Sequence, residues 1–283
     1  MTTIKIASVP EHFNLPWHIA IENKAFEKQN IDLQWTDVPE GTGKMCQMLR
    51  SGETDIAIIL TEGIIKDINA GNPSKLVQIY VETPLIWGIH VATNSNYKKL
   101  EDLKNTKAAI SRLGSGSQLM AYVNANNQGW KTDELQFEVV NTIDGAVEAL
   151  TNGTADYFMW ERFMTKPLVD KGVFRKIADC PTPWPCFVIA VRVEILEQKP
   201  EIIQSILTII NQTTKTFKKI PNIDAVLASN YHQKLEDIQE WLSLTDWSQE
   251  NVDEKLLNNV QKQLFQLKII DKMGTFEEIV KSI

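Results

Sequence analysis

Several features are scarce in this sequence, and each absence narrows what the protein can do. No apolar run approaches the roughly 20 residues that a membrane-spanning helix needs. The longest apolar runs are Ile56–Leu60 and Phe187–Val191. The net charge is −7 and no stripe of Lys and Arg is present, whereas nucleic acids and anionic membranes both favour clustered basic residues. We therefore expect neither a nucleic-acid partner nor membrane insertion.

Cysteine is also scarce, with three residues in 283. Cys46 falls within a predicted helix, where a small buried thiol is the expected role. Cys180 and Cys186 flank a Pro-rich loop, and a disulfide between them would require Cα atoms within about 7 Å. The sequence leaves the bridged and the reduced states open. Because neither a second cysteine pair nor a nearby His completes a ligand set, we expect no metal and no cofactor.

The N-terminus lacks a basic segment and an apolar signal core before the first predicted strand, Ile4–Val9. As the sequence stands, we expect a cytoplasmic protein. A periplasmic or lipid-anchored location is expected instead if a leader has been removed.

The sequence does contain one short motif that occurs twice, called the repeated phrase below. Leu, Gly and Asp recur at the same spacing, at positions 49, 52 and 55 and again at positions 150, 153 and 156. Each phrase is followed by a short apolar run typical of a strand buried on both faces. The pattern predicts a short helix, a Gly that ends it in the left-handed conformation, an Asp and then a buried strand. Two such units indicate two lobes with a cleft between them.

Strands and helices alternate along the chain, which predicts an α/β fold in which each lobe is a mostly parallel sheet flanked by helices. The length also favours two domains of roughly 100–150 residues each. We expect lobe one to comprise residues 1–92 and 187–283, and lobe two to comprise residues 93–186. The two crossings would form a hinge, and hinge motion could close the lobes over a ligand.

Ligands of open α/β sheets bind beyond the carboxyl ends of the strands. The loops at those ends therefore supply the candidate ligand-binding residues, together with the hinge. They are Glu11, His12, Phe13, Asn14, Trp17, Glu40, Thr42, Thr61, Glu62, Glu82, Gly114, Ser115, Ser117, Asp144, Trp160, Glu161 and Trp184.

Carboxylates outnumber cations in this candidate set. If several of them converge, the site repels anions and prefers an amine, another cation or a heterocycle that donates hydrogen bonds. The aromatic residues could stack on a flat or cationic ligand. The Gly-Ser loop before the helix at Gln118 could offer backbone amides to polar groups, although it also fits an ordinary capping turn. We therefore predict a non-anionic or zwitterionic ligand.

The sequence resembles the type 2 periplasmic-binding-protein family, in the solute-binding branch of ABC transporters that includes nitrate-, sulfonate- and taurine-binding proteins and the THI5-like pyrimidine proteins. The residues that carry the resemblance are Ile6–Pro10, the two Leu-x-x-Gly-x-x-Asp phrases, and Leu100–Ser117. Asn105 stands where Gly is usual. The resemblance implies a two-lobed fold with two hinge crossings and covers essentially the whole chain.

This resemblance implies a small-molecule solute-binding protein of the ABC-importer type, with an ABC permease as partner. The alternative is a cytoplasmic enzyme or sensor of the same fold that acts on a pyrimidine or a menaquinone-pathway metabolite; a stand-alone carrier is a third. No Ser-His-Asp order or HExxH motif is present, and His12 beside Glu11 is the one acid–base pair that we can place in the expected cleft. We name no catalytic residue.

Overall fold

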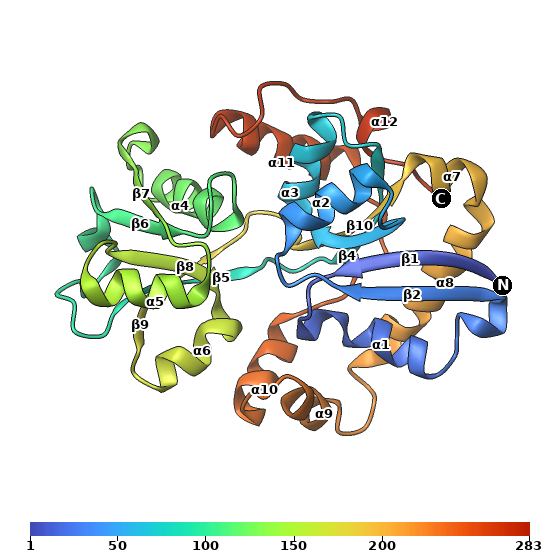
Figure 1. Ribbon diagram of the computed structural model, residues 1–283, viewed down its shortest axis with the longest axis horizontal. Coiled ribbons are helices and arrows are strands. Elements are labelled where there is room, and N and C mark those ends of the chain that lie inside the picture. Colours follow the sequence, from blue (N-terminus) through green and yellow to red (C-terminus); the bar gives the residue numbers. More distant parts are fainter. The chain divides into compact units, whose positions relative to one another are not determined.

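The computed structural model describes residues 1–283, and the chain divides into two compact units (Figure 1). Unit 1 comprises residues 1–83, 184–265 and 270–283, and unit 2 comprises residues 84–183 and 266–269. The sequence-based boundary lay after residue 92, but Ile86–Ala92 pairs within the sheet of unit 2. The extended stretch is interrupted around Pro84 and continues as a separate strand. No helix is both long enough and apolar enough to cross a bilayer.

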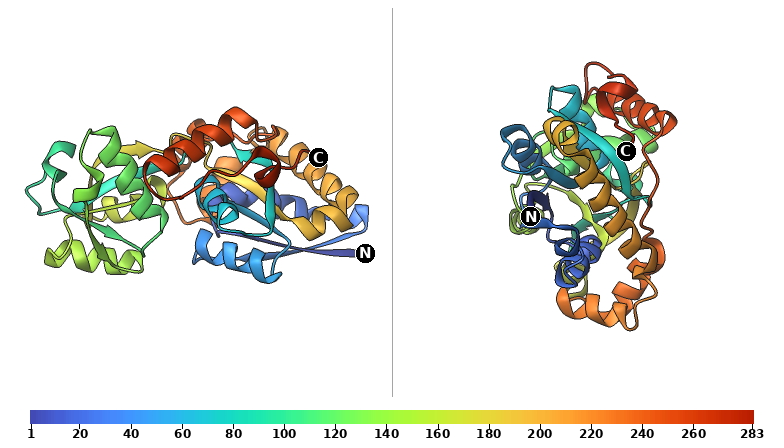
Figure 2. Two further views of the ribbon diagram at one scale, coloured as in Figure 1. Left: turned by 90° about the horizontal axis from the view of Figure 1, so that it is seen from above. Right: turned by 90° about the vertical axis from the view of Figure 1, so that its right-hand side faces the viewer.

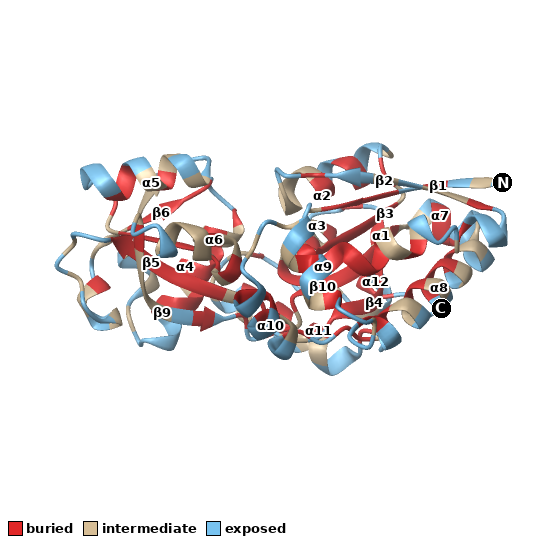
Figure 3. Ribbon diagram, turned by 90° about the horizontal axis from the view of Figure 1, so that it is seen from below, coloured by how far each residue is buried: buried red, intermediate tan, exposed pale blue.

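Unit 1 is built on a five-stranded sheet in the order β2-β1-β3-β10-β4. Its strands are β1 (Thr2–Ser8), β2 (Ile31–Asp37), β3 (Ile56–Leu60), β4 (Ser74–Val81) and β10 (Phe187–Arg192). The pairs of β1 with β2 and β3 are parallel, and those of β10 with β3 and β4 are antiparallel. The central strands are buried on both sides because helices cover both faces of the sheet (Figures 1 and 3).

The helices of unit 1 come from both ends of its sequence. They are α1 (Leu15–Glu22), α2 (Thr42–Ser51), α3 (Thr61–Asn69), α7 (Val193–Gln198), α8 (Pro200–Phe217), α9 (Ile223–Asn230), α10 (Leu235–Leu244), α11 (Glu254–Gln266) and α12 (Phe276–Ile279), with short 3₁₀ turns at His12–Asn14 and Glu27–Gln29. Helices α1 and α8 pack together on one side, and α12 packs beside α3 (Figure 2).

The edge strand β4 is covered by the C-terminal part of the chain. The Ile79 amide donates to the Glu250 carbonyl at 2.9 Å, and the Lys281 amide donates to the Leu76 carbonyl at 2.9 Å. These hydrogen bonds satisfy backbone groups of β4 that would stay unpaired if the edge of the sheet were uncovered. They also hold the last residues of the chain beside α3.

Unit 2 repeats the same plan with the sheet order β7-β6-β8-β5-β9. Its strands are β5 (Ile86–Ala92), β6 (Lys107–Ile110), β7 (Gln136–Val139), β8 (Tyr157–Glu161) and β9 (Phe174–Pro181); its helices are α4 (Gly116–Asn127), α5 (Ile143–Asn152) and α6 (Arg162–Asp170), and its 3₁₀ turns are Leu100–Leu103 and Thr132–Glu134. The β6 pairs are parallel and the β5 pairs are antiparallel. The predicted two-lobed α/β fold, with one sheet flanked by helices in each lobe, is thus confirmed.

The repeated phrase has the predicted structure in both units. Helices α2 and α5 end at Gly52 and Gly153, which have φ values of 74° and 77°. The following aspartates, Asp55 and Asp156, then play identical roles. Asp55 exchanges hydrogen bonds with the Lys5 backbone in β1, and Asp156 does the same with the Lys107 backbone in β6. The phrase therefore ends a helix and fastens the start of the next strand to its neighbour.

Asn105, which stands where the resembling family usually has Gly, adopts a φ of 64°. This is the left-handed region, which Gly enters without cost and which Asn tolerates better than most residues. The departure therefore preserves the local backbone conformation.

Candidate functional site

In each unit the parallel strands end at one edge of the sheet, and the candidate residues follow those ends. β1 and β3 lead into residues 11–14 and into α3, and β6 and β8 lead into residues 111–117 and into α6. This edge is where ligands of open α/β sheets bind. The two edges are described separately below.

The loop after β1 is held by distant residues. The Asn14 side-chain amide donates to Ser8 Oγ at 2.8 Å and to the Val9 carbonyl at 2.7 Å. The Phe13 carbonyl accepts from the Tyr80 hydroxyl at 2.8 Å and from Trp247 Nε1 at 3.1 Å. These contacts fix the loop in one conformation. Tyr80 and Trp247 were not among the predicted residues, because nothing in the local sequence links them to this loop.

His12 is fully buried in unit 1, and neither of its ring nitrogens has a hydrogen-bond partner. Its ring stacks on Trp241 with 4.1 Å between centroids. Burial lowers the pKa of His12 to about 3, so the imidazole is neutral at physiological pH. Desolvation raises the pKa of the neighbouring Glu11, which is partly buried, to about 7. The loop therefore presents neutral or weakly acidic groups among aromatic rings.

The start of α3 brings together a second group of predicted residues. Glu62 is buried, and its Oε2 accepts from Trp184 Nε1 at 2.8 Å. Burial raises the pKa of Glu62 to about 7, although hydrogen bonds from its own backbone and from the Trp184 indole oppose the shift. Thr61 Oγ1 donates to the Pro185 carbonyl at 2.6 Å, which ties α3 to the segment carrying Trp184. A Cβ at Gly63 would lie 2.3 Å from Thr42 Cγ2, so α2 and α3 approach closely here.

In unit 2 the loop after β6 is stabilised by serine hydroxyls. Ser117 Oγ accepts from the Ser111 amide at 3.0 Å and contacts Ser115 Oγ at 3.0 Å. Ser115 caps α4 by accepting from the Gln118 amide, and Gly114 donates its amide to the Gln118 side chain at 2.6 Å. The first two amides of α4, at positions 116 and 117, have no acceptor in the structure. They point along the positive end of the helix dipole.

Trp87 in β5 adds a third donor beside these amides. Its indole Nε1 is buried without a partner. A Cβ at Gly116 would lie 3.0 Å from Trp87 Cη2, so the indole ring packs tightly against the start of α4. Trp87 also contacts the predicted Trp160 edge-on, with 6.2 Å between centroids. The sequence analysis missed Trp87 because it assigned this strand to the other lobe.

The end of β8 supplies a buried carboxylate. Glu161 caps α6, with its Oε2 accepting from the Met164 amide at 2.7 Å. Trp160 stacks on Phe158 with 5.5 Å between centroids and an interplanar angle of 20°. Unit 2 therefore combines N–H donors, an aromatic surface and one carboxylate in neighbouring positions.

The remaining predicted residues lie outside these groups. Trp17 is fully buried in the core of unit 1, stacked on Phe26, so its ring surface is used for packing. Glu40, Glu82 and Asp144 are exposed: Glu40 lies in the turn before α2, Glu82 directly follows β4, and Asp144 lies in the first turn of α5. The three cysteines are buried free thiols, and no group of three or more His, Cys, Asp or Glu side chains could hold a metal ion.

Comparison with known proteins agrees with this architecture. The profile of the family described as Ca3427-like PBP matches residues 87–180. The solved structure of the CA3427 gene product of Candida albicans, described as defining a new family with the generic periplasmic-binding-protein fold, is similar over 100% of this chain and 97% of its own. The TM-score is 0.90 and the sequence identity is 26%. A search of curated protein sequences gave no significant match.

Two further structures are sulfonate-binding proteins. SsuA from Escherichia coli, a periplasmic aliphatic sulphonate binding protein, has a TM-score of 0.77 and 19% identity, covering 100% of this chain and 92% of its own. The alkanesulfonate-binding SsuA from Xanthomonas axonopodis pv. citri, bound to MOPS, has a TM-score of 0.83 and 13% identity, covering 100% and 99%. At these identities the likeness concerns the fold. The chain therefore has the two-lobed periplasmic-binding-protein fold, and it resembles the SsuA-like and THI5-like members of the type 2 family.

Proposed function

We propose that this chain is a solute-binding protein of the ABC-importer type that closes two lobes over a non-anionic or zwitterionic organic molecule. An ABC permease is the partner that this function requires. The mechanism is binding without chemistry: a ligand that contacts residues of both units stabilises the closed form by its higher affinity for that form. The neighbours named as sulfonate-binding share the fold, and their ligand does not transfer to this chain at such low identity.

The main observation in support of this ligand class is the buried Glu62 carboxyl group, which accepts a hydrogen bond from the Trp184 indole. Removing a carboxylate from water is costly unless a cation or several donors compensate for the lost hydration. In this structure the donors to the carboxyl are its own backbone N–H and the Trp184 indole N–H, and no cation pairs with it. An ammonium or another N–H donor of a ligand would supply the missing compensation.

The donors of unit 2 support the zwitterionic form of the proposal. Two free α4 amides and Trp87 Nε1 favour an acceptor or an anionic group. A sulfonate or nitrate would satisfy these donors but would offer nothing to Glu62. A molecule with both a donor end and an acceptor end satisfies both units.

The test is a calorimetric titration of the tightest ligand found in a metabolite screen, with three forms of the protein. Loss of one charge-assisted hydrogen bond weakens binding by about tenfold or more. We expect this loss in Glu62→Gln and an unchanged affinity in Glu197→Gln, which alters an exposed carboxylate outside the candidate ligand-binding residues. A tight ligand that is a sulfonate without an amine, bound equally by both variants, would overturn the proposed ligand class. A ligand that is chemically consumed would overturn the binding mechanism.

A further inference from the structure

Two segments join the sheet of unit 1 to the sheet of unit 2, and each of them changes unit at a proline. The segment from β4 to β5 does so between Thr83 and Pro84. The segment from β9 to β10 does so between Pro183 and Trp184. The stretch 266–269 is also grouped with unit 2, but it belongs to neither sheet. Because proline has no amide hydrogen, neither proline can donate a backbone hydrogen bond that would stiffen its segment.

On the unit 1 side, the second segment is tied to the start of α3 by three hydrogen bonds. Trp184 Nε1 donates to Glu62 Oε2 at 2.8 Å, and both residues are buried. Thr61 Oγ1 donates to the Pro185 carbonyl at 2.6 Å, and the Thr61 amide donates to the Cys186 carbonyl at 3.1 Å. The segment is therefore fixed to unit 1 from the first residue after its proline.

Hydrogen bonds also fix the other residues that flank the two prolines. Within unit 1, the Cys186 amide donates to the Thr83 carbonyl and the Asp246 amide donates to Thr83 Oγ1, both at 3.2 Å. Within unit 2, the Thr182 amide donates to the Leu85 carbonyl and the Leu85 amide donates to Thr182 Oγ1, both at 3.0 Å. One proline therefore remains between the fixed residues of each segment.

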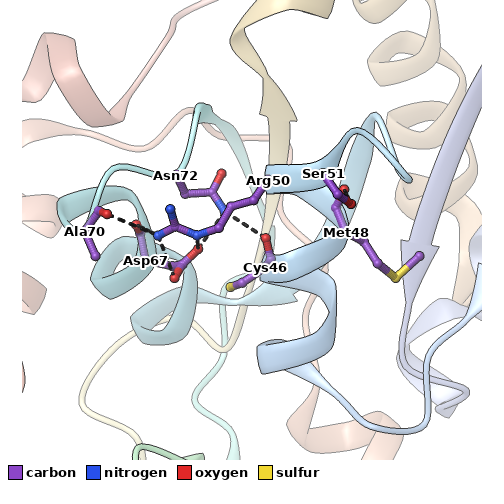
Figure 4. Close-up of polar contacts among 7 residues, drawn as sticks. All are labelled: Cys46, Met48, Arg50, Ser51, Asp67, Ala70 and Asn72. Carbon is purple, nitrogen blue, oxygen red and sulfur yellow. Dashed lines mark hydrogen bonds and ion pairs between the residues drawn. The ribbon is translucent and has the colours of Figure 1, made fainter.

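Helix α3, which anchors the second segment, is itself fixed to α2 at its far end (Figure 4). Arg50 Nε donates to Asp67 Oδ2 at 2.9 Å, and Arg50 Nη2 donates to the Ala70 carbonyl at 3.2 Å. The Asn72 side-chain nitrogen donates to Asp67 Oδ2 at 2.6 Å and to the Cys46 carbonyl at 3.1 Å. Because these contacts hold the end of α3, a group that is bonded to its start is held by the body of unit 1.

We propose that the two units move about a hinge at Pro84 and Pro183. The hydrogen bond from Trp184 to Glu62 is the latch that holds the unit 1 side of this hinge. Hinges are a few residues that absorb the change in backbone angles, and here the fixed residues leave only the prolines and the bonds beside them. The inference rests on the proposed function, because Glu62 is the residue that meets the ligand there. It assigns Trp184 a positioning role beside the ligand site.

The latch connects the ligand to the hinge through the charge of Glu62. Hydrogen bonds to an ionised acceptor are roughly twice as strong as those between neutral groups. A ligand ammonium that keeps the Glu62 carboxylate ionised therefore strengthens the hydrogen bond from Trp184. Ligand binding thereby stiffens the segment next to Pro183, and loss of the ligand loosens it.

The first test is amide hydrogen exchange of the ligand-free full chain, compared between the wild type and Trp184→Phe, which keeps an aromatic ring and removes the N–H donor. We expect the Cys186 amide to exchange about tenfold faster in the variant, because one buried hydrogen bond to a charged group accounts for a factor of that size. The Thr182 amide, on the other side of Pro183, should keep its rate. Trp35→Phe removes a 2.8 Å hydrogen bond from an indole to a carboxylate in β2 and should change neither rate.

The second test measures the movement of the units by pulsed electron spin resonance, with spin labels on Glu197→Cys in α7 and Asn127→Cys in α4. Both positions are exposed, whereas the natural cysteines are buried. The distribution of distances between the labels should broaden in Trp184→Phe. It should also broaden in Pro183→Ala, which frees a backbone angle at the hinge. Pro181→Ala removes another exposed proline, at the end of β9, and should leave the distribution unchanged.

Thr61→Val removes a second hydrogen bond to the same segment, and Thr61→Ser keeps it. The first should reproduce the effects of Trp184→Phe and the second should not, so the inference is tested even if one variant folds poorly. It is overturned if the Cys186 rate or the distance distribution stays unchanged. It is also overturned if Thr182 accelerates as much as Cys186, because that means a general loss of stability. All these measurements use the ligand-free protein, so a ligand that is chemically consumed would overturn the proposed function alone.

Discussion

Replacing Glu62 by Gln is expected to stabilise the protein above neutral pH. Burial raises the pKa of this carboxyl from 4.5 to about 7. The folded state therefore holds a proton that the unfolded state has lost, and the free energy of unfolding falls as the pH rises from about 4.5 to about 7. At 1.36 kcal/mol per pKa unit, the ionised group costs about 3 kcal/mol above pH 7. Gln keeps an oxygen that can accept from Trp184 and carries no charge.

The assay is urea denaturation of the wild type and of Glu62→Gln from pH 4 to pH 8.5. Comparing the two proteins at each pH is necessary because His12 acts in the opposite direction. Its pKa is lowered to about 3, so it contributes stability above pH 6.5 that is lost on acidification. The difference in the free energy of unfolding between the two proteins isolates the contribution of Glu62 to the pH dependence. It should be near zero at about pH 4 and grow to about 3 kcal/mol in favour of the variant above pH 7.

Glu40→Gln, at an exposed carboxylate, controls for the loss of one negative charge and should show no such growth. A difference for Glu62→Gln that stays constant with pH, or that favours the wild type at high pH, would refute the reasoning. That result would mean that Glu62 finds a compensating partner for its charge in the folded protein.

Three other predictions concern parts of the fold away from Glu62. Gly153→Ala should cost about 1 kcal/mol of stability in chemical denaturation, because φ is 77° and a Cβ there meets no other atom; no loss would contradict a left-handed helix end. Thr165→Val should cost about 1–3 kcal/mol, because Thr165 Oγ1 is the 2.9 Å partner of buried His90 Nε2; a neutral result would mean that water replaces the hydroxyl. Burial raises the pKa of Cys46 to about 12, so iodoacetamide should label it only after unfolding, and rapid labelling of the native protein would contradict its burial.

The repeated phrase could be interpreted from the sequence because its physics is local. A Gly that ends a helix and an apolar run too short for a helix are encoded within a dozen neighbouring residues. The same locality let the sequence place Glu62 and Glu161 in polar turns that directly follow buried strands, and in the structure they lie at the starts of α3 and α6.

The roles of several tryptophans could not be predicted from the sequence because they depend on long-range packing. Trp87 belongs to a strand whose partners, β8 and β9, are formed by residues far along the chain. Trp247 reaches the Phe13 carbonyl through tertiary packing that no local pattern encodes. The burial of Trp17 depends in the same way on neighbours brought by the fold. The sequence therefore predicts which residues lie in the loops at the strand ends. Tertiary packing then decides whether each of their side chains can contact a ligand or is used up in the core.

The most direct test of the central claim is a thermal-shift screen of the purified protein against zwitterions, amines, pyrimidines, carboxylates and sulfonates. A ligand that binds only the folded protein adds about 2.7 kcal/mol of stability at a hundredfold excess over Kd. The account predicts that a zwitterionic or other non-anionic molecule raises the melting temperature and is recovered unchanged. A rise with simple sulfonates or carboxylates alone would contradict the assigned ligand class, and a molecule that is converted during the assay would contradict a protein that only binds.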